Sequence, residues 1–99
     1  MIEKKQLAKI VNDTYYETQE DLNNDLIEDW EQVFFNRLDD QLETDTEKVI
    51  AHLFYADDDT IAEVVENILF DLSQETLLQS FSFEPYDNMV VMVCIVAKK

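Results

Sequence analysis

The segment Met89–Ala97 constrains the fold of this chain more than any other, because all nine of its residues are apolar. A strand with one face in water alternates apolar and polar residues, and this segment does not alternate. We therefore expect a strand that is buried on both faces. Either the chain's own helices cover both faces, or helices cover one face and a second subunit covers the other. A chain of 99 residues builds one modest core, so we favour a homodimer.

The same apolar segment bears on where the protein resides. It is too short to cross a bilayer, which takes about 20 apolar residues in a helix. The single cysteine, Cys94, excludes an internal disulfide and fits a reducing compartment. The N-terminus carries no signal-peptide pattern. We expect a cytoplasmic protein, located in the host cytoplasm if the chain is encoded by a phage, with no membrane partner.

The remaining residues predict an α+β fold in which about four helices precede a C-terminal antiparallel β-hairpin. Apolar residues spaced three and four apart predict a long helix over 18–43, and the same spacing is clearest over 61–72. Turn-forming residues at 84–88 separate two strands. No glycine, repeat or linker divides the chain, so residues 1–99 form a single acidic α+β domain. The predicted helices cover 2–12, 18–43, 46–55 and 61–72, and the predicted strands cover 76–83 and Met89–Ala97.

The charge balance is the most unusual part of the composition. Twenty-three Asp and Glu oppose seven Lys and Arg, giving a formal net charge of -16. Residues 13–87 alone carry 22 acids against Arg37 and Lys48. This sign excludes electrostatic binding to DNA, RNA or an anionic membrane. We therefore expect a basic protein, such as a DNA-binding protein or a nuclease, as the partner, with no direct contact to nucleic acid.

Within the predicted helix 18–43, acidic residues form a stripe that no Lys or Arg interrupts. They fall within an arc of about 100° and span roughly 33 Å, close to the length of one turn of B-DNA. Like charges four residues apart destabilise a helix by a few tenths of a kcal/mol per pair, so stability alone would not select the stripe. We expect it to bind the partner. The stripe consists of Asp21, Asp25, Glu28, Asp29, Asp39 and Glu43.

Further acids extend this predicted partner-binding surface. Asp57, Asp58 and Asp59 precede the helix that carries Glu63 and Glu66. An alternative role for the run 57–59 is to cap that helix and to interact favourably with its dipole. An alternative for the whole acidic surface is an adaptation to solubility or to high salt.

Enzymatic chemistry finds no support in the residue pattern. The chain has no glycine-rich phosphate loop and no recognisable pair of nucleophile and base, and its only histidine, His52, lies within a predicted helix. The acids of 57–59 followed by Glu63 lack the glycine and the spacing of an EF-hand. We expect no catalytic, cofactor or metal site.

In length, charge and helical character, the whole chain resembles phage-encoded DNA-mimic anti-restriction proteins. These are small acidic inhibitors that occupy the DNA-binding groove of restriction enzymes, glycosylases or nucleoid proteins. The resemblance implies a host-defence inhibitor, and some members of the class are dimers. It rests on no shared motif, so it assigns no role to any residue.

Two other classes of function fit the same composition. One is an immunity or antitoxin protein for a basic toxin nuclease, which would contact a single enzyme through a compact patch. The other is an acidic adaptor for histone-like proteins. The DNA mimic remains the leading expectation.

Overall fold

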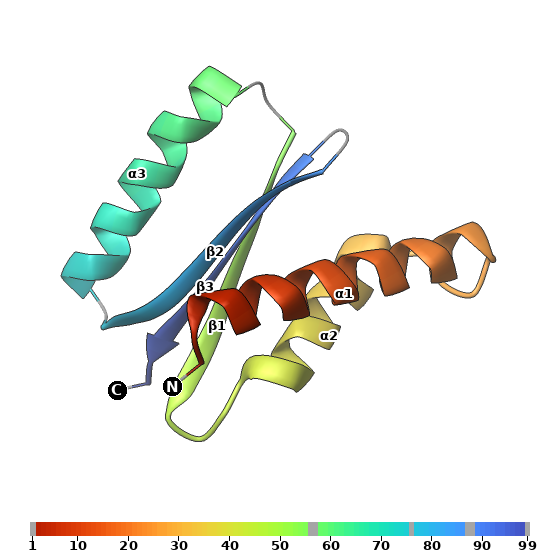
Figure 1. The fold of residues 1–99 in the computed structure, drawn as a ribbon, viewed down its shortest axis with the longest axis horizontal. Helices are drawn as coiled ribbons and strands as arrows, with labels where there is room; N and C mark the ends of the chain where they lie inside the picture. Colours follow the sequence, from red (N-terminus) through yellow and green to blue (C-terminus); the bar gives the residue numbers. More distant parts are fainter. Residues whose placement is uncertain (1, 56–57, 76, 87–88, 99) are drawn as a thin grey trace.

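The apolar segment Met89–Ala97 is strand β3, which lies between β1 (Glu47–Phe54) and β2 (Leu78–Tyr86) in a three-stranded antiparallel sheet. A computed structural model describes residues 2–55, 58–75, 77–86 and 89–98. Over these residues the chain is a single α+β domain (Figure 1). The elements follow the order α1 (Lys4–Asn23), α2 (Trp30–Leu42), β1 (Glu47–Phe54), α3 (Asp58–Glu75), β2 (Leu78–Tyr86) and β3 (Met89–Ala97).

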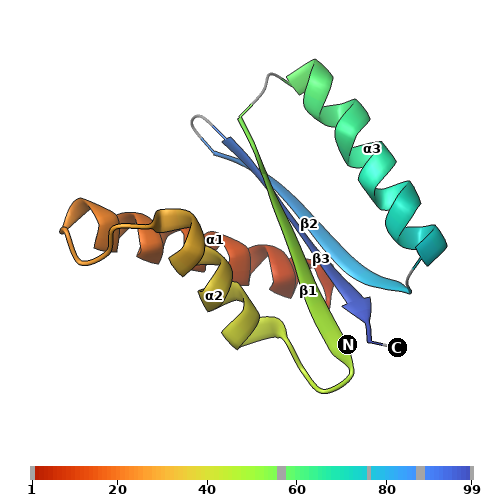
Figure 2. The same ribbon diagram turned by 180° about the vertical axis from the view of Figure 1, so that it is seen from behind.

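Helices cover both faces of the sheet, with α1 and α2 on one side and α3 on the other (Figures 1 and 2). Because successive side chains of a strand point to opposite faces, β3 contributes to two cores. Val91, Val93 and Ile95 pack with α1 and α2, whereas Met92 and Cys94 pack with α3. This arrangement explains why the segment does not alternate.

Strand β3 is buried within one chain, as the first of the two sequence-based alternatives expects. Every residue from Val90 to Val96 is at most 6% exposed. The predicted homodimer rested partly on the need for a second subunit to cover this strand. Burial of β3 does not require that subunit.

The predicted single helix over 18–43 is wrong, because α1 ends at Asn23 and α2 begins at Trp30. Asp25 has a φ angle of 58°, a left-handed conformation that Asn and Asp tolerate better than most residues. Asp29 then caps α2, since its side chain accepts a hydrogen bond from the Gln32 backbone N–H at 3.1 Å. The predicted helix over 2–12 is correspondingly too short, because α1 runs on to Asn23.

The predicted helix over 46–55 is also wrong, because these residues form the edge strand β1. It pairs with β3 in antiparallel register, with Glu47 opposite Ala97 and Phe54 opposite Val90. Apolar side chains of β1 enter both cores, Val49 on the α1–α2 side and Ile50 on the α3 side. A strand with two buried faces carries a short run of consecutive apolar residues, and such a run cannot be distinguished from a buried helix by its periodicity. This ambiguity explains the wrong prediction.

The periodic residues 61–72 lie within α3, as predicted, and the C-terminal hairpin pairs β2 with β3, with Tyr86 opposite Met89. The bounds of the first predicted strand, 76–83, are only partly right, because β2 runs from Leu78 to Tyr86. Residues 84–86, predicted as part of the turn, therefore pair with β3, and position 76 lies outside the described residues. The fold therefore has three helices and a three-stranded sheet over the described residues, in place of four helices and a hairpin. None of these three helices combines the length and apolar character that crossing a membrane demands.

The buried thiol of Cys94 leads to a prediction about alkaline stability. Burial raises its pKa to about 11 from an ordinary value of 9.0. As pH rises through this interval, the unfolded thiol ionises before the folded one, so the free energy of unfolding should fall by up to about 3 kcal/mol. Urea unfolding at several pH values in this interval measures the fall, and Cys94→Ala should reduce it. Rapid reaction of the native protein with a thiol reagent near neutral pH would contradict the prediction.

Candidate protein-binding surface

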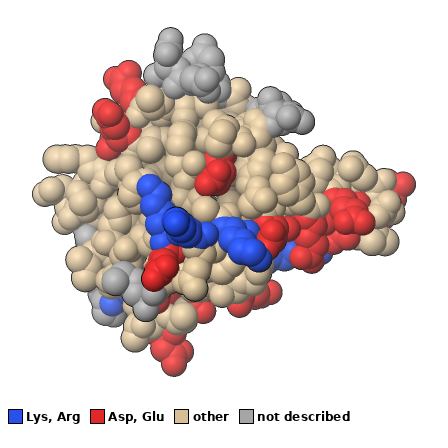
Figure 3. All heavy atoms as spheres, in the orientation of Figure 1, with Lys and Arg blue, Asp and Glu red and all other residues tan. Residues whose placement is uncertain are grey.

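The junction of α1 and α2 projects beyond the sheet and is rich in acidic residues (Figure 1). Figure 3 shows Asp and Glu gathered toward this projecting end of α1, with Lys and Arg nearer its start. We call residues 17–31 the α1–α2 tip. It contains seven acids and no Lys or Arg, namely Glu17, Glu20, Asp21, Asp25, Glu28, Asp29 and Glu31.

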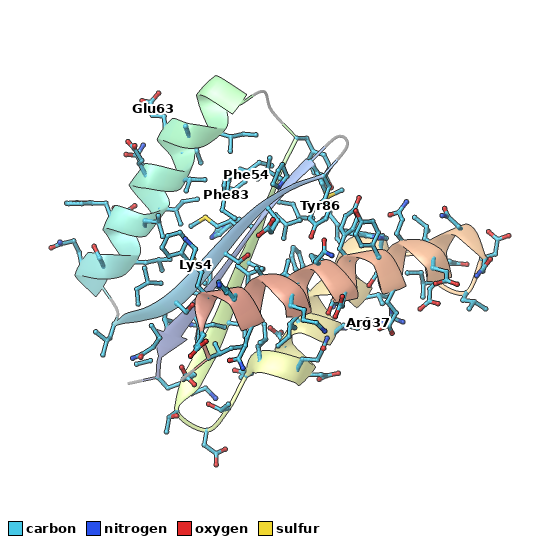
Figure 4. All side chains as sticks on the ribbon, viewed as in Figure 1. Lys4, Arg37, Phe54, Glu63, Phe83 and Tyr86 are labelled. Carbon is cyan, nitrogen blue, oxygen red and sulfur yellow. The ribbon has the colours of Figure 1, made fainter. Side chains whose placement is uncertain are left out.

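Arg37 of α2 is the cation that binds the tip (Figure 4). Its Nη2 lies 2.6 Å from Asp21 Oδ2, and its Nη1 lies 3.6 Å from Glu17 Oε1. Nη1 also donates to the hydroxyl of Thr18 at 3.3 Å, and that residue is fully buried. The expectation that no basic residue interrupts the stripe is therefore wrong, because Arg37 pairs with Asp21, one of its members.

The interface between α1 and α2 leads to a prediction about Arg37. Replacing it with alanine leaves Asp21 without its guanidinium, and that carboxylate side chain is only 23% exposed. We expect Arg37→Ala to lower the free energy of unfolding by about 1–3 kcal/mol, measured by urea denaturation. Lys9→Ala is the control, because the Lys9–Asp13 pair is exposed and should contribute less than about 1 kcal/mol. Equal effects of the two substitutions would show that the Arg37 contacts do not stabilise the interface.

The six acids of the predicted stripe do not form one row. Asp21 lies on α1, Asp25 and Glu28 lie in the connecting segment, and Asp29 caps α2. Asp39 and Glu43 lie at the far end of α2, and Lys98 Nζ is 3.5 Å from Glu43 Oε1. The tip brings the first four residues together, and the remaining two are separated from them by the length of α2. A straight row of carboxylates along a single helix does not exist, because residues 24–29 break that helix.

The other predicted binding residues belong to a different face. Glu63 and Glu66 are exposed on α3, across the sheet from the tip (Figures 1 and 4). Asp58 and Asp59 begin α3, and Asp57 lies outside the described residues. The sheet therefore separates the acids of α3 from those of α1 and α2.

The placement of acids along α1 and α2 opposes the stability of these helices. The C-terminal end of a helix carries a partial negative charge, and an acid there costs about 0.3–1 kcal/mol. Glu20 and Asp21 lie in the last turn of α1, and Asp39 and Asp40 lie in the last turn of α2, where neither helix has a basic residue. Burial raises the pKa of Asp39, and the charges of Glu43 and Asp40 raise it further. With respect to the helix dipole, these positions are unfavourable for folding.

An open cleft of about 630 Å³ lies at the base of the tip. Trp30 and Tyr55 line it together with the carboxylates of Glu28, Asp29 and Glu31. The residue pattern does not predict this cleft, because Tyr55 follows β1, a strand that the sequence predicts as a helix. The mixture of acids and an aromatic residue in the sequence Glu28-Asp-Trp-Glu31 is the only local signal for it.

His52 takes no part in this surface. It lies on β1 rather than on a helix, and its ring is stacked with that of Phe54 at a centroid distance of 6.2 Å. Among the residues that the structure describes, no group of three His, Cys, Asp or Glu side chains could hold a metal ion.

Comparison with known proteins gave no match to this chain among protein-family models, curated proteins or solved structures.

Proposed function

We propose that this chain is a non-enzymatic inhibitor that binds the nucleic-acid-binding cleft of a basic protein. The observation that supports the proposal best is the α1–α2 tip, where Arg37 pairs with only two of seven acids and two acids lie in the last turn of α1. Such charge costs folding stability, so its retention is accounted for by a partner of opposite charge. A host restriction or defence nuclease is the kind of target that the resemblance to DNA mimics suggests.

The mechanism we propose is electrostatic competition with DNA. Lys and Arg that normally hold phosphates would instead pair with carboxylates of the tip. Opposite fields accelerate association, and salt screens the attraction because the Debye length is about 8 Å at physiological ionic strength. The proposed contact surface is the α1–α2 layer, and α3 lies outside it.

The form of the tip favours one alternative function, an immunity protein for a basic toxin nuclease. The tip is a compact patch built from two helix ends and a connecting segment, rather than a rod of charge. A compact patch suits contact with one active-site cleft. A DNA mimic and an immunity protein differ in their targets, because an immunity protein protects against one cognate toxin, whereas a mimic competes with DNA for a DNA-binding protein.

Affinity capture at low ionic strength tests the proposal. The immobilised chain is incubated with lysate of the host cell, and bound proteins are eluted with duplex DNA. We expect a basic DNA-binding protein that DNA releases and whose binding to labelled DNA the free chain inhibits. Coexpression that protects cells against one cognate toxin nuclease would favour the immunity protein. Absence of any captured nucleic-acid-binding protein would overturn the proposal.

A further inference from the structure

We propose that the cleft beside Trp30 receives an arginine side chain of the basic partner. This inference rests on the proposed function and adds to it the chemistry of one contact. The expected ligand is a guanidinium, because the cleft combines an aromatic wall with carboxylates, and these two groups bind this cation best in proteins.

The aromatic wall is held in place by packing. The Trp30 ring is stacked with the buried Phe34 ring at a centroid distance of 4.8 Å, and Tyr15 meets it edge-on at 5.5 Å. Tyr55 is 59% exposed, and its hydroxyl donates to Glu31 Oε1 at 2.8 Å. These contacts fix the rings before a partner arrives, which lowers the entropic cost of binding.

The carboxylates of the cleft keep the capacity to bind a cation. Asp29 uses Oδ1 to cap α2, and Glu31 uses Oε1 to accept from Tyr55. An ionised carboxylate has two oxygens and about four lone-pair positions, so each can accept further donors. The N-terminus of α2 contributes only about half a positive charge, against three carboxylates that include Glu28. The field within the cleft therefore remains negative.

Within the described part of the chain, no Lys or Arg lines the cleft. Arg37 is engaged by Asp21 and Glu17, and its side chain is only 28% exposed. Another protein can supply the missing cation. A guanidinium fits this site better than an ammonium, because it is planar, stacks on aromatic faces and donates two parallel hydrogen bonds to a carboxylate.

The exposed surface near the cleft is suited to contact with a protein. Tyr16 is 57% exposed and, together with Tyr86, lines a second depression that shares Tyr15 and Gln19 with the first. Leu26, at the end of the tip, is 70% exposed. Aromatic anchors in pockets provide much of the binding energy in protein interfaces, and arginine is enriched among the residues that fill such pockets.

The only tryptophan of the chain, Trp30, makes the cleft directly observable, because the intrinsic indole fluorescence comes from this residue. The probes are nona-arginine and nona-lysine peptides, titrated into the full chain at low ionic strength. A fluorescent label on the peptide reports total binding by anisotropy, whereas unlabelled peptide reports occupation of the cleft through Trp30 emission. We expect nona-arginine to change this emission saturably and to bind several-fold more tightly than nona-lysine.

A matched pair of variants tests the position of the site. Glu28→Gln, Asp29→Asn and Glu31→Gln together remove three charges, while Asn can still cap α2 and Gln can still accept from Tyr55. This triple variant should weaken nona-arginine binding about tenfold and remove the emission change. The control removes three exposed charges from α3 by Glu63→Gln, Glu66→Gln and Asp71→Asn, and it should weaken binding less than threefold. Circular dichroism verifies that both variants fold.

The outcomes separate this inference from the proposed function. Peptide binding without a change in Trp30 emission, equal losses in the two triple variants, or an equal response to nona-lysine would each overturn the arginine site. A DNA-displaceable partner captured by the chain would leave the proposed function standing in those cases. Conversely, a specific nona-arginine response without such a partner would support the cleft and overturn the proposed function.

Discussion

Replacing Glu20 and Glu28 with lysine should weaken binding of the basic partner by at least about 100-fold. Each substitution removes an attraction and adds a repulsion, and juxtaposed like charges cost several kcal/mol across an interface. These two residues are chosen because their side chains make no recorded hydrogen bond or ion pair in the described structure. Asp21 and Asp29 are unsuitable, since one binds Arg37 and the other caps α2. Asp25 has a left-handed backbone that lysine would strain.

The double variant should retain its fold, because Lys at position 20 lies in the last turn of α1, where a positive charge is favourable. The dissociation constant for the captured partner is the measurement, and thermal unfolding is the check on the fold. Glu63→Lys with Glu66→Lys on α3 makes the same change in net charge on the opposite face of the sheet. If this control weakens binding equally, total charge governs binding and the tip is not the contact surface.

Salt should have opposite effects on partner binding and on folding. Raising the salt concentration from about 50 mM to about 500 mM shortens the Debye length to less than half, which should weaken partner binding about 100-fold. The same change screens repulsion among the acids of the free protein, so the free energy of unfolding should rise by about 1–2 kcal/mol.

The two salt responses distinguish a binding surface from an adaptation to solubility or to high salt. Isothermal titration with the captured partner gives the first response, and urea unfolding of the free chain gives the second. A surface adapted only to salt would show the rise in stability without salt-sensitive, specific binding. Partner binding that is insensitive to salt would contradict the electrostatic mechanism.

The sequence correctly predicted the elements whose apolar residues must be buried. It did not predict the break between α1 and α2, where turn-forming residues compete with helical spacing. The apolar run of β3 has no stable alternative to burial, and the periodicity over 61–72 fits only a helix. At the α1–α2 junction, Leu26 and Ile27 continue the helical spacing, although Leu26 is 70% exposed. The turn-forming residues Asn24 and Asp25 and the Asp29 cap outweigh that spacing locally.

The charge of the candidate binding surface was predictable from the sequence, but its geometry was not. The acids of the tip lie close together in the sequence, so the sequence alone predicts a negatively charged segment there. The pairing of Arg37 with Asp21 joins two helices that had been predicted as one. The hydrogen bond between Tyr55 and Glu31 joins residues 24 positions apart, through a strand that had been predicted as a helix. Contacts of this kind follow from tertiary structure, which the residue pattern alone does not specify.

The distribution of charge along α1 has a consequence for how the molecule approaches other proteins. The lysines of this helix lie between residues 4 and 9 and its acids between residues 13 and 21, in the same sense as the dipole of the peptide backbone. The side chains and the backbone of α1 therefore reinforce each other, and this helix has a permanent electric axis that ends at the tip. Near a cationic surface this axis experiences a torque that turns the acidic end forward. Collisions would thus be oriented before any atoms touch, so a larger share of encounters would be productive.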